Sequence, residues 1–579
     1  MRPWHLGNTT VRSPFRLRDG LIALSSSNLL GNIKGSEYES AFAWLLNEAD
    51  VVALDRTVGD DVSDLGRKWR SAMTQLGLIV PELNQRDTEL NQAWIGTPFT
   101  LTANGRRLIS ADAVPAMQEC FLRSLAAYRI PSVLETGYHI EQFSPLRYTL
   151  SVMLELERRI GQNNLDFIEI ATIVQLTSSA DNLAETCDRI LLLRGDREAS
   201  ANKRRFDNEA YEAAGLASGH QPGTFRDYAD LNIRYLKATG VVQSRGRGIS
   251  IVPEKHLLAS QLVDEVFEIL DSKTYLQTLC AGAVLPTDNR DSAKLVLDDL
   301  LQKVRERGIE FDVAGRPVEE AADIAVIRYE LEELIAEDKE IAFAAIQVDA
   351  IEEISTYMKL IAERGTSAQL STGDLISVPR SEAPAYFEWT LWRAFLAMNS
   401  LVNKPYESRR FKIDQDFLPI GCAPGGGPDL IFEFEEFVIV VEVTLTESSR
   451  QEAAEGEPVR RHVADIMRDN MLRETGKVVY GLFLANKIDS NTAETFRIGV
   501  WYLPDDSRTQ LDIVPISLSA FRTFFDAVFD NRVNGHETLR NALKEAISLR
   551  QIPGGAPAWK SKVNELVGAF VSGEDILGT

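Results

Sequence analysis

The chain has 579 residues, of which 44% are hydrophobic and 25% charged, so it has the composition of a globular protein long enough for several domains. The formal net charge of −23 excludes a uniformly basic nucleic-acid-binding protein. The longest apolar runs, such as FVIVVEV, have strand length and are too short to cross a membrane, and the four cysteines form no CxxC pair. We therefore expect a cytoplasmic protein without a membrane span, a disulfide framework or a zinc site.

The charge is unevenly distributed along the chain. Residues 288–340 contain 16 Asp and Glu against 8 Lys and Arg, whereas residues 203–247 are mildly basic. The whole-chain charge therefore does not exclude DNA binding, and it places any DNA-binding surface in the N-terminal half.

The first predicted elements form two similar groups. A basic arm without the apolar core of a signal peptide is followed by helices predicted at 36–54 and 64–77. The stretch TPFTLTANGRRLI (97–109) then reads as two extended pieces joined by an Asn-Gly turn. The second group lies at 225–254, where a predicted helix leads into the strands GVVQ and ISIV around an RGRG turn. A helix followed by a hairpin is typical of a winged-helix module, although a generic α+β segment gives the same pattern.

Arginines of this half are the candidate DNA contacts. Arg106 and Arg107 lie at the first predicted turn, and Arg245 and Arg247 at the second. Each pair stands beside glycines that let the backbone approach a phosphate, although exposed charge at a turn needs no functional explanation. The arm and the predicted helices add further candidates: Arg12, Arg16, Arg67, Arg70, Arg226 and Arg234.

The middle of the chain is predicted to be helical. Residues 144–161 and 166–199 have the character of scaffold helices. Residues 291–365 alternate acidic, basic and apolar positions at helical spacing, which predicts an acidic helical connector with a solvated charged face. The stretch GTSAQLSTGD (365–374) ends this pattern.

The C-terminal part interleaves strands and helices. An aromatic-rich helix is predicted at 383–399, and two strands follow in GGGPDLIFEFEEFVIVVEVTLTES (425–448). A polar helix at 453–472, strands at 477–485 and 497–503, and a strand and helix at 512–530 come next. This order predicts an α/β domain with a mixed sheet.

Two carboxylates mark the strands at 425–448. Asp429 opens the first strand and Glu442 lies near the end of the second, and a turn at Glu435 and Glu436 makes the strands antiparallel neighbours. Glu442 and Thr444 then face one side of the sheet. Because adjacent carboxylates repel, and a hard divalent cation such as Mg²⁺ relieves that repulsion with oxygen ligands, the pair predicts a metal site. A second Pro-Asp pair, Pro504-Asp505, lacks a following strand with a suitably placed acid.

The stretch from YFEWTLWRAF through the two strands to EGEPVRRH resembles the catalytic domain of the AlwI-type restriction endonucleases, which include type IIS and nicking enzymes. In the N-terminal half, RPWHLGNTTVRSPFRLRDGL and RDYADLNIRYLKATGVVQSRGRGISIVPEK are similar to the opening segment and the second DNA-binding subdomain of that group. The resemblance implies a multidomain α+β protein with a mainly helical recognition half containing winged-helix modules, a helical linker and a PD-(D/E)xK nuclease domain with a mixed sheet. We expect the boundaries 1–140, 141–285, 286–372 and 373–579.

The resemblance also implies site residues and a cofactor. It implies that Mg²⁺, with Mn²⁺ as a substitute, is bound by Asp429, Glu442, Val443 and Glu388, and that Glu388, Asp429, Glu442, Thr444, Glu455 and His462 form the catalytic set. Thr444 stands where most PD-(D/E)xK nucleases have Lys, and His462 is the candidate to position or deprotonate water.

Three members of this set have alternative interpretations. Glu388 could be a helix-surface acid, and Glu455 could stabilise the start of a helix through the helix dipole. His462 follows Arg460 and Arg461 and could belong to a solvated basic turn, while those arginines could contact phosphates of the cleaved strand.

The expected function is site-specific cleavage of double-stranded DNA, with type IIS character. A single active site cuts one strand, so a double-strand break requires a transient homodimer through the nuclease domains or a second cleavage subunit. A strand-specific nicking enzyme and a non-catalytic winged-helix DNA-binding protein are the alternatives.

Overall fold

The structure is a computed structural model that describes residues 2–54, 62–84, 87, 89–178, 183–447 and 449–572, with side-chain surroundings up to residue 567. The chain divides into two compact units, Met1–Ile335 and Ala336–Thr579. Within the described ranges, no helix has the length and apolar character needed to cross a membrane.

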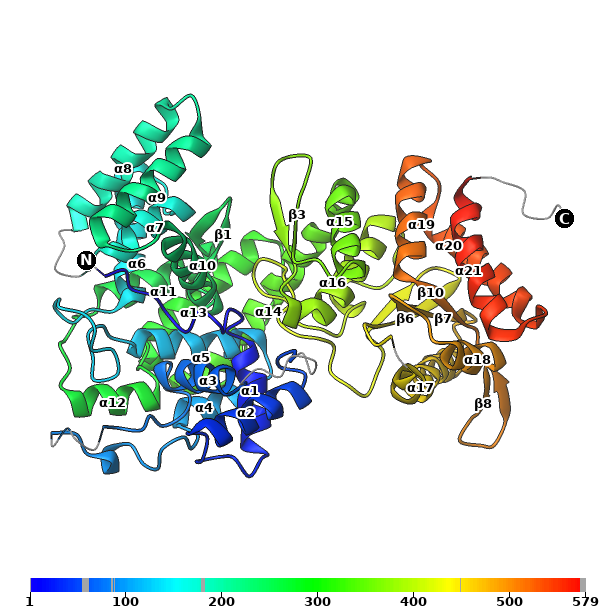
Figure 1. Cartoon of the computed structure of the whole chain (residues 1–579), viewed down its shortest axis with the longest axis horizontal. Helices are drawn as coiled ribbons and strands as arrows, with labels where there is room; N and C mark the ends of the chain where they lie inside the picture. Colours follow the sequence, from blue (N-terminus) through cyan, green and yellow to red (C-terminus); the bar gives the residue numbers. More distant parts are fainter. Residues whose placement is uncertain are drawn as a thin grey trace. The chain divides into compact units, whose positions relative to one another are not determined.

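The first unit is mainly helical, as Figure 1 shows. Its helices are α1 (Arg16–Ser25), α2 (Ser36–Glu48), α3 (Ser63–Gln75), α4 (Ala103–Ser110), α5 (Val114–Ala127), α6 (Pro145–Ile160), α7 (Phe167–Thr172), α8 (Leu183–Ala199), α9 (Lys203–Ser218), α10 (Pro222–Ala238), α11 (His256–Asp264), α12 (Ser272–Ala281) and α13 (Arg290–Glu306). Helix α14 (Ala321–Ala345) continues from the first unit into the second. The predicted helices at 36–54, 64–77 and 144–161 are thus confirmed, with slightly different bounds. The stretch predicted at 166–199 forms two α-helices, α7 and α8, and residues 179–182 between them lie outside the described residues.

The acidic connector is helical as predicted, but it is not a uniformly solvated rod. Helix α13 and the first part of α14 form an apolar cluster of their own that includes Leu297, Leu300, Ile327 and Leu331. Helix α15 (Ile351–Ala362), in contrast, packs into the core of the second unit. The charged residues therefore cover helices whose other faces are buried.

The hairpin of the second predicted group is confirmed. Strands β1 (Val242–Arg245) and β2 (Gly248–Ile251) pair antiparallel after α10, with Arg245 opposite Gly248. The backbone of Leu165 extends this ribbon by exchanging hydrogen bonds of 2.8 and 2.9 Å with Ile249. A Cβ at Gly248 would overlap the Leu165 carbonyl oxygen, so this close approach requires glycine.

The Asn-Gly hairpin predicted at 97–109 is wrong. Residues 103–110 form α4, which begins where the Thr102 hydroxyl accepts a 2.9 Å hydrogen bond from the Gly105 amide. Asn104 is buried and donates to the Cys120 carbonyl (3.1 Å) and the Ser124 hydroxyl (2.9 Å), so its side chain stabilises packing on α5 rather than a turn. The first predicted wing is therefore absent from this segment.

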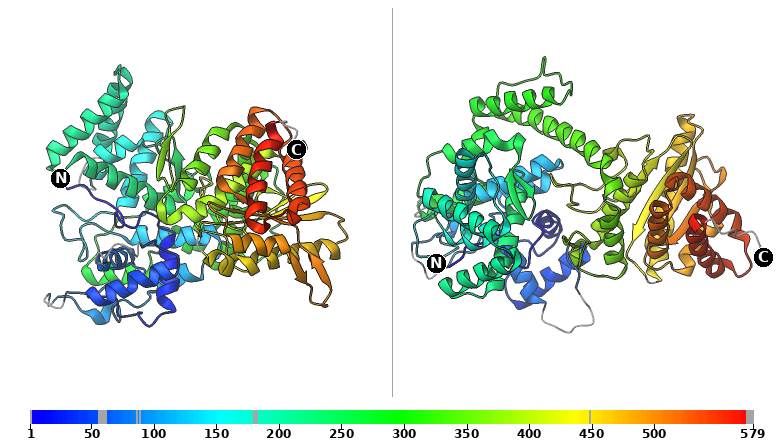
Figure 2. Two further views of the ribbon diagram at one scale, coloured as in Figure 1. Left: turned by 45° about the vertical axis from the view of Figure 1, so that its right-hand side comes forward. Right: turned by 90° about the horizontal axis from the view of Figure 1, so that it is seen from above.

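The second unit is built on a four-stranded mixed sheet in the order β10-β7-β6-β5 (Figures 1 and 2). Strands β5 (Leu430–Glu433) and β6 (Phe437–Thr444) are antiparallel, while β7 (Val478–Ala485) and β10 (Ile513–Ser517) run parallel to β6. The predicted mixed α/β sheet is confirmed. The strand predicted at 497–503 is shorter and belongs to a separate hairpin, β8 (Val500–Tyr502) and β9 (Arg508–Gln510), and a third hairpin joins β3 (Ser367–Gln369) to β4 (Leu375–Ser377).

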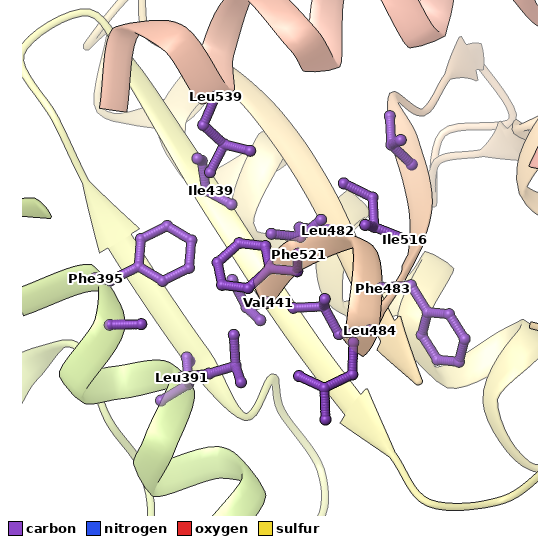
Figure 3. Close-up of a cluster of buried hydrophobic side chains, with 14 of the residues drawn as sticks. Leu391, Phe395, Ile439, Val441, Leu482, Phe483, Leu484, Ile516, Phe521 and Leu539 are labelled. Atoms are coloured by element: carbon purple, nitrogen blue, oxygen red, sulfur yellow. The ribbon is translucent and has the colours of Figure 1, made fainter. Parts of the chain in front are cut away.

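Helices cover both faces of this sheet. Besides α15, the second unit contains α16 (Ala383–Met398), α17 (Arg450–Leu472), α18 (Ser490–Ile498), α19 (Leu518–Asp530), α20 (Gly535–Ser548) and α21 (Gly555–Ser572). Figure 3 shows Phe395 of α16 and Phe521 of α19 against Ile439 and Val441 of β6. On the opposite face, Phe483 of β7 packs against α18. The alternation along β6 therefore directs Glu442 away from the Phe395 face, toward α17.

Candidate active site

The β5–β6 hairpin places two carboxylates side by side at the edge of the sheet. Leu430 pairs with Val441, so continuation of the register by one residue sets Asp429 opposite Glu442. The Val443 amide donates a 2.9 Å hydrogen bond to Oδ2 of Asp429, which fixes that carboxylate against β6. The predicted pairing of the two strands and the turn at Glu435 and Glu436 are confirmed.

Glu388 brings a third carboxyl group from α16. Its side chain is buried, and Oε2 accepts a 2.7 Å hydrogen bond from the Ala423 amide and a further bond from the Cys422 thiol. Burial raises the pKa of Glu388, and the nearby Asp429 raises it further. Glu388 is therefore not a surface acid; it belongs to the same electrostatic cluster as Asp429 and Glu442.

Helix α17 supplies Glu455 and His462. His462 is 6% exposed, and its Nδ1 lies 2.6 Å from Oε1 of Glu442, so the solvated-turn interpretation of His462 is wrong. Glu455 lies in the second turn of a helix that begins at Arg450, so it does not occupy the helix start; the Thr444 hydroxyl donates a hydrogen bond to it. The structure thus brings Thr444, Glu455, Glu442 and His462 together.

The electrostatics of this cluster favour proton uptake by its acids. Burial and then the charge of Glu455 raise the pKa of Glu442 to about 8, and burial and Glu442 raise that of Asp429 well above its ordinary value. Burial also raises the pKa of Glu455. Arg410 lowers the pKa of Asp429 and of Glu442 but does not offset these effects. A site that gathers acids against their own repulsion is suited to a cation.

His462 is a neutral base in this environment. Burial and then the positive charges of Arg461 and Arg410 lower its pKa. Its Nδ1 faces a carboxyl oxygen of Glu442, while Nε2 is buried and has no hydrogen-bond partner among the described residues. When Glu442 is ionised, it holds the proton on Nδ1, and the Nε2 lone pair is then available to accept a proton.

The residues fit a hard divalent cation. Asp429, Glu442 and Glu388 offer carboxylate oxygens, and the backbone at Val443 lies directly against Asp429. Mg²⁺ is characteristically held by one or two carboxylates together with water. Among the described residues, no group of three or more His, Cys, Asp or Glu side chains lies in an arrangement that could hold a metal ion, so the fit rests on the Asp429–Glu442 pair and the backbone at Val443.

The loop before β5 contains residues that the sequence did not single out. Cys422 and Ala423 hold Glu388, and Arg410 donates a 3.4 Å hydrogen bond to the Pro428 carbonyl next to Asp429. The glycine-rich run GCAPGGGPD was a signal for an unusual backbone here, but nothing in it indicated contact with a helix more than thirty residues earlier.

The candidate DNA-contacting arginines all lie in the first unit and fall into two groups. Arg245 and Arg247 are exposed at the tip of the β1–β2 hairpin, beside Gly246, and form no ion pair with a described residue. Most others contact groups of the same unit: Arg12 with Asp227 (2.9 Å) and Asp230 (3.4 Å), Arg234 with Asp230 (2.9 Å), Arg16 with Asp19 (3.6 Å), Arg67 with Asp64, Arg70 with Glu39 (2.5 Å), and Arg226 with Asn208 (2.8 Å).

Arg106 and Arg107 lie on α4 rather than at a wing tip. Arg106 donates to the Leu101 carbonyl (2.7 Å), and Arg107 donates to the Asn104 side chain (2.9 Å) and the Ala281 carbonyl (3.2 Å). Their contacts with the protein account for their positions, so the argument from turn geometry no longer supports them as DNA contacts.

Comparison with known proteins identifies the class. Residues 74–524 match the AlwI restriction endonuclease family. A match to a restriction endonuclease family over most of the chain places the protein among the DNA-cleaving hydrolases. The chain belongs to the AlwI restriction endonuclease family, which confirms the resemblance found in the sequence. No curated protein matches the chain.

Three solved structures show weaker likeness. The small subunit (R.BspD6I2) of the heterodimeric restriction endonuclease R.BspD6I is 24% identical, covering 37% of this chain and 97% of that chain, with a TM-score of 0.28. The BpuJ1 endonuclease binding domain, solved with pyrene- and phenanthrene-modified DNA, is 11% identical over 46% of this chain and 90% of its own, with a TM-score of 0.30. Restriction endonuclease FokI is 11% identical over 94% and 99% of the two chains, with a TM-score of 0.26.

Proposed function

We propose that the protein is a Mg²⁺-dependent, site-specific DNA endonuclease of type IIS character with a PD-(D/E)xK nuclease site in the second unit. The observation that carries this proposal is the placement of Asp429 opposite Glu442, with the Val443 amide bonded to Asp429. Glu388 completes a set of buried oxygen donors at the same edge of the sheet. Mn²⁺ has the same preference for oxygen ligands and is expected to substitute.

The residues of the site have distinct tasks in this proposal. Asp429, Glu442, Glu388 and the backbone at Val443 would hold Mg²⁺, which when bound polarises the phosphodiester and lowers the pKa of water. His462 Nε2 accepts the proton that the attacking water loses as its oxygen bonds to phosphorus. The bond from phosphorus to the leaving oxygen then breaks, and that oxygen takes a proton from solvent.

Two further groups assist in place of the lysine common in PD-(D/E)xK enzymes. Glu442 holds His462 through the 2.6 Å contact with Nδ1, which keeps Nε2 unprotonated and available. Thr444 donates to Glu455 and fixes the second carboxylate of α17 beside Glu442. The task of the lysine is thus divided between a neutral histidine and an ordered carboxylate.

Recognition is proposed for the first unit. The exposed pair Arg245 and Arg247 beside Gly246 is suited to hold backbone phosphates, and neighbouring helices read base edges of a short asymmetric site. Cleavage follows at a fixed downstream distance. Because the described part of the second unit contains one such cluster, one engagement cuts one strand; a double-strand break needs a transient homodimer or a second cleavage subunit. If neither forms, the protein is a nicking endonuclease.

Incubation of supercoiled plasmid with the protein in Mg²⁺ and in EDTA tests the proposal. We expect relaxed or linear DNA in Mg²⁺ alone, and the ratio of these products separates nicking from double-strand cleavage. Asp429→Asn should abolish cleavage while DNA binding persists, whereas Asp505→Asn, at the exposed second Pro-Asp pair, should cleave normally. Undamaged plasmid in every condition would favour the non-catalytic DNA-binding alternative, and normal cleavage by Asp429→Asn would move the metal site elsewhere.

A further inference from the structure

The first unit contains two arginines that lie close together without an acidic partner. Arg129 follows α5 and is 9% exposed, and Arg147 lies in the first turn of α6 and is half-buried. Among the described residues, no carboxylate lies within ion-pair distance of either guanidinium. This is unusual, because a buried charge is ordinarily neutralised by a partner of opposite sign.

The hydrogen bonds that these arginines make are to neutral groups. Arg129 Nη1 donates to the carbonyls of Ala126 (2.6 Å) and Tyr128 (3.3 Å), while its Nε is buried and has no acceptor. Arg147 Nη2 donates to the carbonyl oxygens of Val263 (3.0 Å) and Glu265. Carbonyl dipoles orient the two cations, and the Glu265 carboxylate acts on Arg147 through space without forming an ion pair with it.

The two charges also repel each other. Burial and then the positive charge of Arg147 lower the pKa of Arg129 to about 10. Burial lowers the pKa of Arg147 as well, and the negative charge of Glu265 offsets only part of that effect. Bringing two guanidiniums together in a partly buried position costs stability, and an anion placed between them would recover that cost.

One aromatic ring occupies the place where an anion would be expected. The guanidinium carbon of Arg129 lies 4.7 Å from the centroid of the Phe267 ring, and that of Arg147 lies 5.6 Å from it. The negative face of an aromatic ring is a weak substitute for an anion. Phe267 thus covers the pair with a group that a real anion can outcompete.

Phe267 belongs to a segment that is attached mainly at its ends. The segment 265–271 joins α11 to α12; Arg147 bonds to its first carbonyl, and the Gln142 side chain bonds to the backbone of Leu270 at 2.8 and 3.3 Å. Between these points Val266 and Ile269 are 84% and 71% exposed. An open hollow of 630 Å³ beside Glu265 is lined by Asp264 and Asp288 as well as by Val284 and Leu285. The ring of Phe267 can therefore move without unfolding a helix.

We propose that Arg129 and Arg147 form a phosphate-binding site that Phe267 covers in the free protein, and that a backbone phosphate of duplex DNA enters it when the first unit binds DNA. The identity of the ligand as DNA rests on the function proposed above, whereas the preference for a phosphate rests on the arginine pair alone. Two guanidiniums matched to one tetrahedral anion are the arrangement by which arginine recognises phosphate.

The salt dependence of DNA binding by the full chain tests this proposal. Each phosphate contact contributes about −0.9 to the slope of log K against log salt concentration. We expect Arg147→Gln to make that slope shallower by about one unit and to weaken binding equally for duplexes of different sequence. Arg158→Gln is the matched control on the same helix, because Arg158 has a 71% exposed side chain and pairs with Glu155; its slope should equal that of the wild type. An unchanged slope in Arg147→Gln would overturn the proposal.

Two further measurements separate the ligand sources and guard against misfolding. Phe267→Ala removes the cover and leaves both arginines, so it should retain the full salt slope. A slope reduced as in Arg147→Gln would mean that the ring holds the arginines against the phosphate and would overturn its role as a cover. Inorganic phosphate, compared with chloride at equal ionic strength, should raise the melting temperature of the wild type more than that of Arg147→Gln. Phosphate stabilisation without any change in DNA slope would assign the site to a free phosphate and overturn the DNA contact. A wild-type protein that does not bind duplex DNA would instead contradict the proposed function itself.

Discussion

At the scale of single residues, the raised pKa of Glu442 links the stability of the protein to pH. Its pKa of about 8 means that between pH 4.5 and 8 the folded, metal-free protein holds a proton that the unfolded chain releases. The free energy of unfolding must then fall as the pH rises through this window. Mg²⁺, which binds the ionised form, should reverse the effect and release protons as it binds.

Glu442→Gln tests this consequence. The variant keeps the shape and a hydrogen bond to His462 Nδ1 but has no proton to lose, so its melting temperature in EDTA should fall less steeply between pH 5 and 8 than that of the wild type. The remaining slope comes from Asp429, Glu388 and Glu455, whose pKa values burial also raises. The titration of Glu442 should cost the wild type about 3–4 kcal/mol over the same range, because only part of the shift lies between pH 5 and 8. Thermal unfolding in EDTA provides the measurement. Glu435→Gln, at the exposed β5–β6 turn, should follow the wild type, and a wild-type stability that is flat with pH would show that Glu442 is already ionised.

How much of the site could be predicted differs from residue to residue. Asp429 and Glu442 followed from the sequence because a two-residue turn and a period of two fix which positions meet across a hairpin. Glu388, Glu455 and His462 came only from the family resemblance, since they reach the site from helices whose orientation no local pattern gives. Cys422 and Ala423 were missed because their contact with Glu388 depends on the path of an irregular loop.

At the scale of elements, only one of the two predicted hairpins formed. The RGRG turn formed because Val242 to Ile251 alternate around a glycine with φ of +58° and pair with Leu165. The Asn-Gly pair at 104–105 satisfied the same local rule, yet it became helical. Thr102 caps α4, Asn104 bonds to α5, and Gly105 lies against the backbone of Leu78, so tertiary contacts outweighed the turn preference.

Two glycines, one in α4 and one in α8, allow the effect of tertiary contacts to be measured separately from helix propensity. A Cβ at Gly105 would overlap the Leu78 carbonyl oxygen, so Gly105→Ala should destabilise the protein by about 1–3 kcal/mol despite the better helix propensity of alanine. Gly195 lies inside α8 with open space around it, so Gly195→Ala should stabilise by up to about 1 kcal/mol. Urea unfolding should show a lower free energy of unfolding for Gly105→Ala and a higher one for Gly195→Ala. Stabilisation by Gly105→Ala would mean that α4 does not pack on Leu78.

At the scale of the whole molecule, the two units have separate means of stabilisation. The second has an extensive apolar core around its sheet and a candidate active site whose acids repel one another without a cation. The first includes a buried ion network: Glu119 of α5 pairs with Arg123 (2.8 Å) and with Arg328 of α14, and Arg123 pairs with Asp288 (2.6 Å). Acid should therefore destabilise the first unit, and Mg²⁺ should stabilise the second.

This difference predicts two calorimetric transitions with distinct ligands. Burial alone would raise the pKa of Glu119, but Arg328 and Arg123 lower it to about 2. The network therefore stabilises the first unit fully above pH 4.5, and about 3 kcal/mol is lost as the pH falls toward 2. Calorimetry at decreasing pH should show one transition moving down through this window, while Mg²⁺ at neutral pH raises the other transition alone.

Substitutions assign these transitions to the units. Glu119→Gln should lower the acid-sensitive transition at neutral pH, because it leaves the buried Arg328 with only the 3.8 Å contact to Glu332. It should also flatten the further decline of that transition in acid. Glu155→Gln is the control, since Glu155 also has a pKa lowered to about 2 but lies at the surface, where ion pairs with Arg158 and Arg159 contribute little. A single transition that responds to both acid and Mg²⁺ would show instead that the continuous helix α14 couples the two units into one cooperative structure.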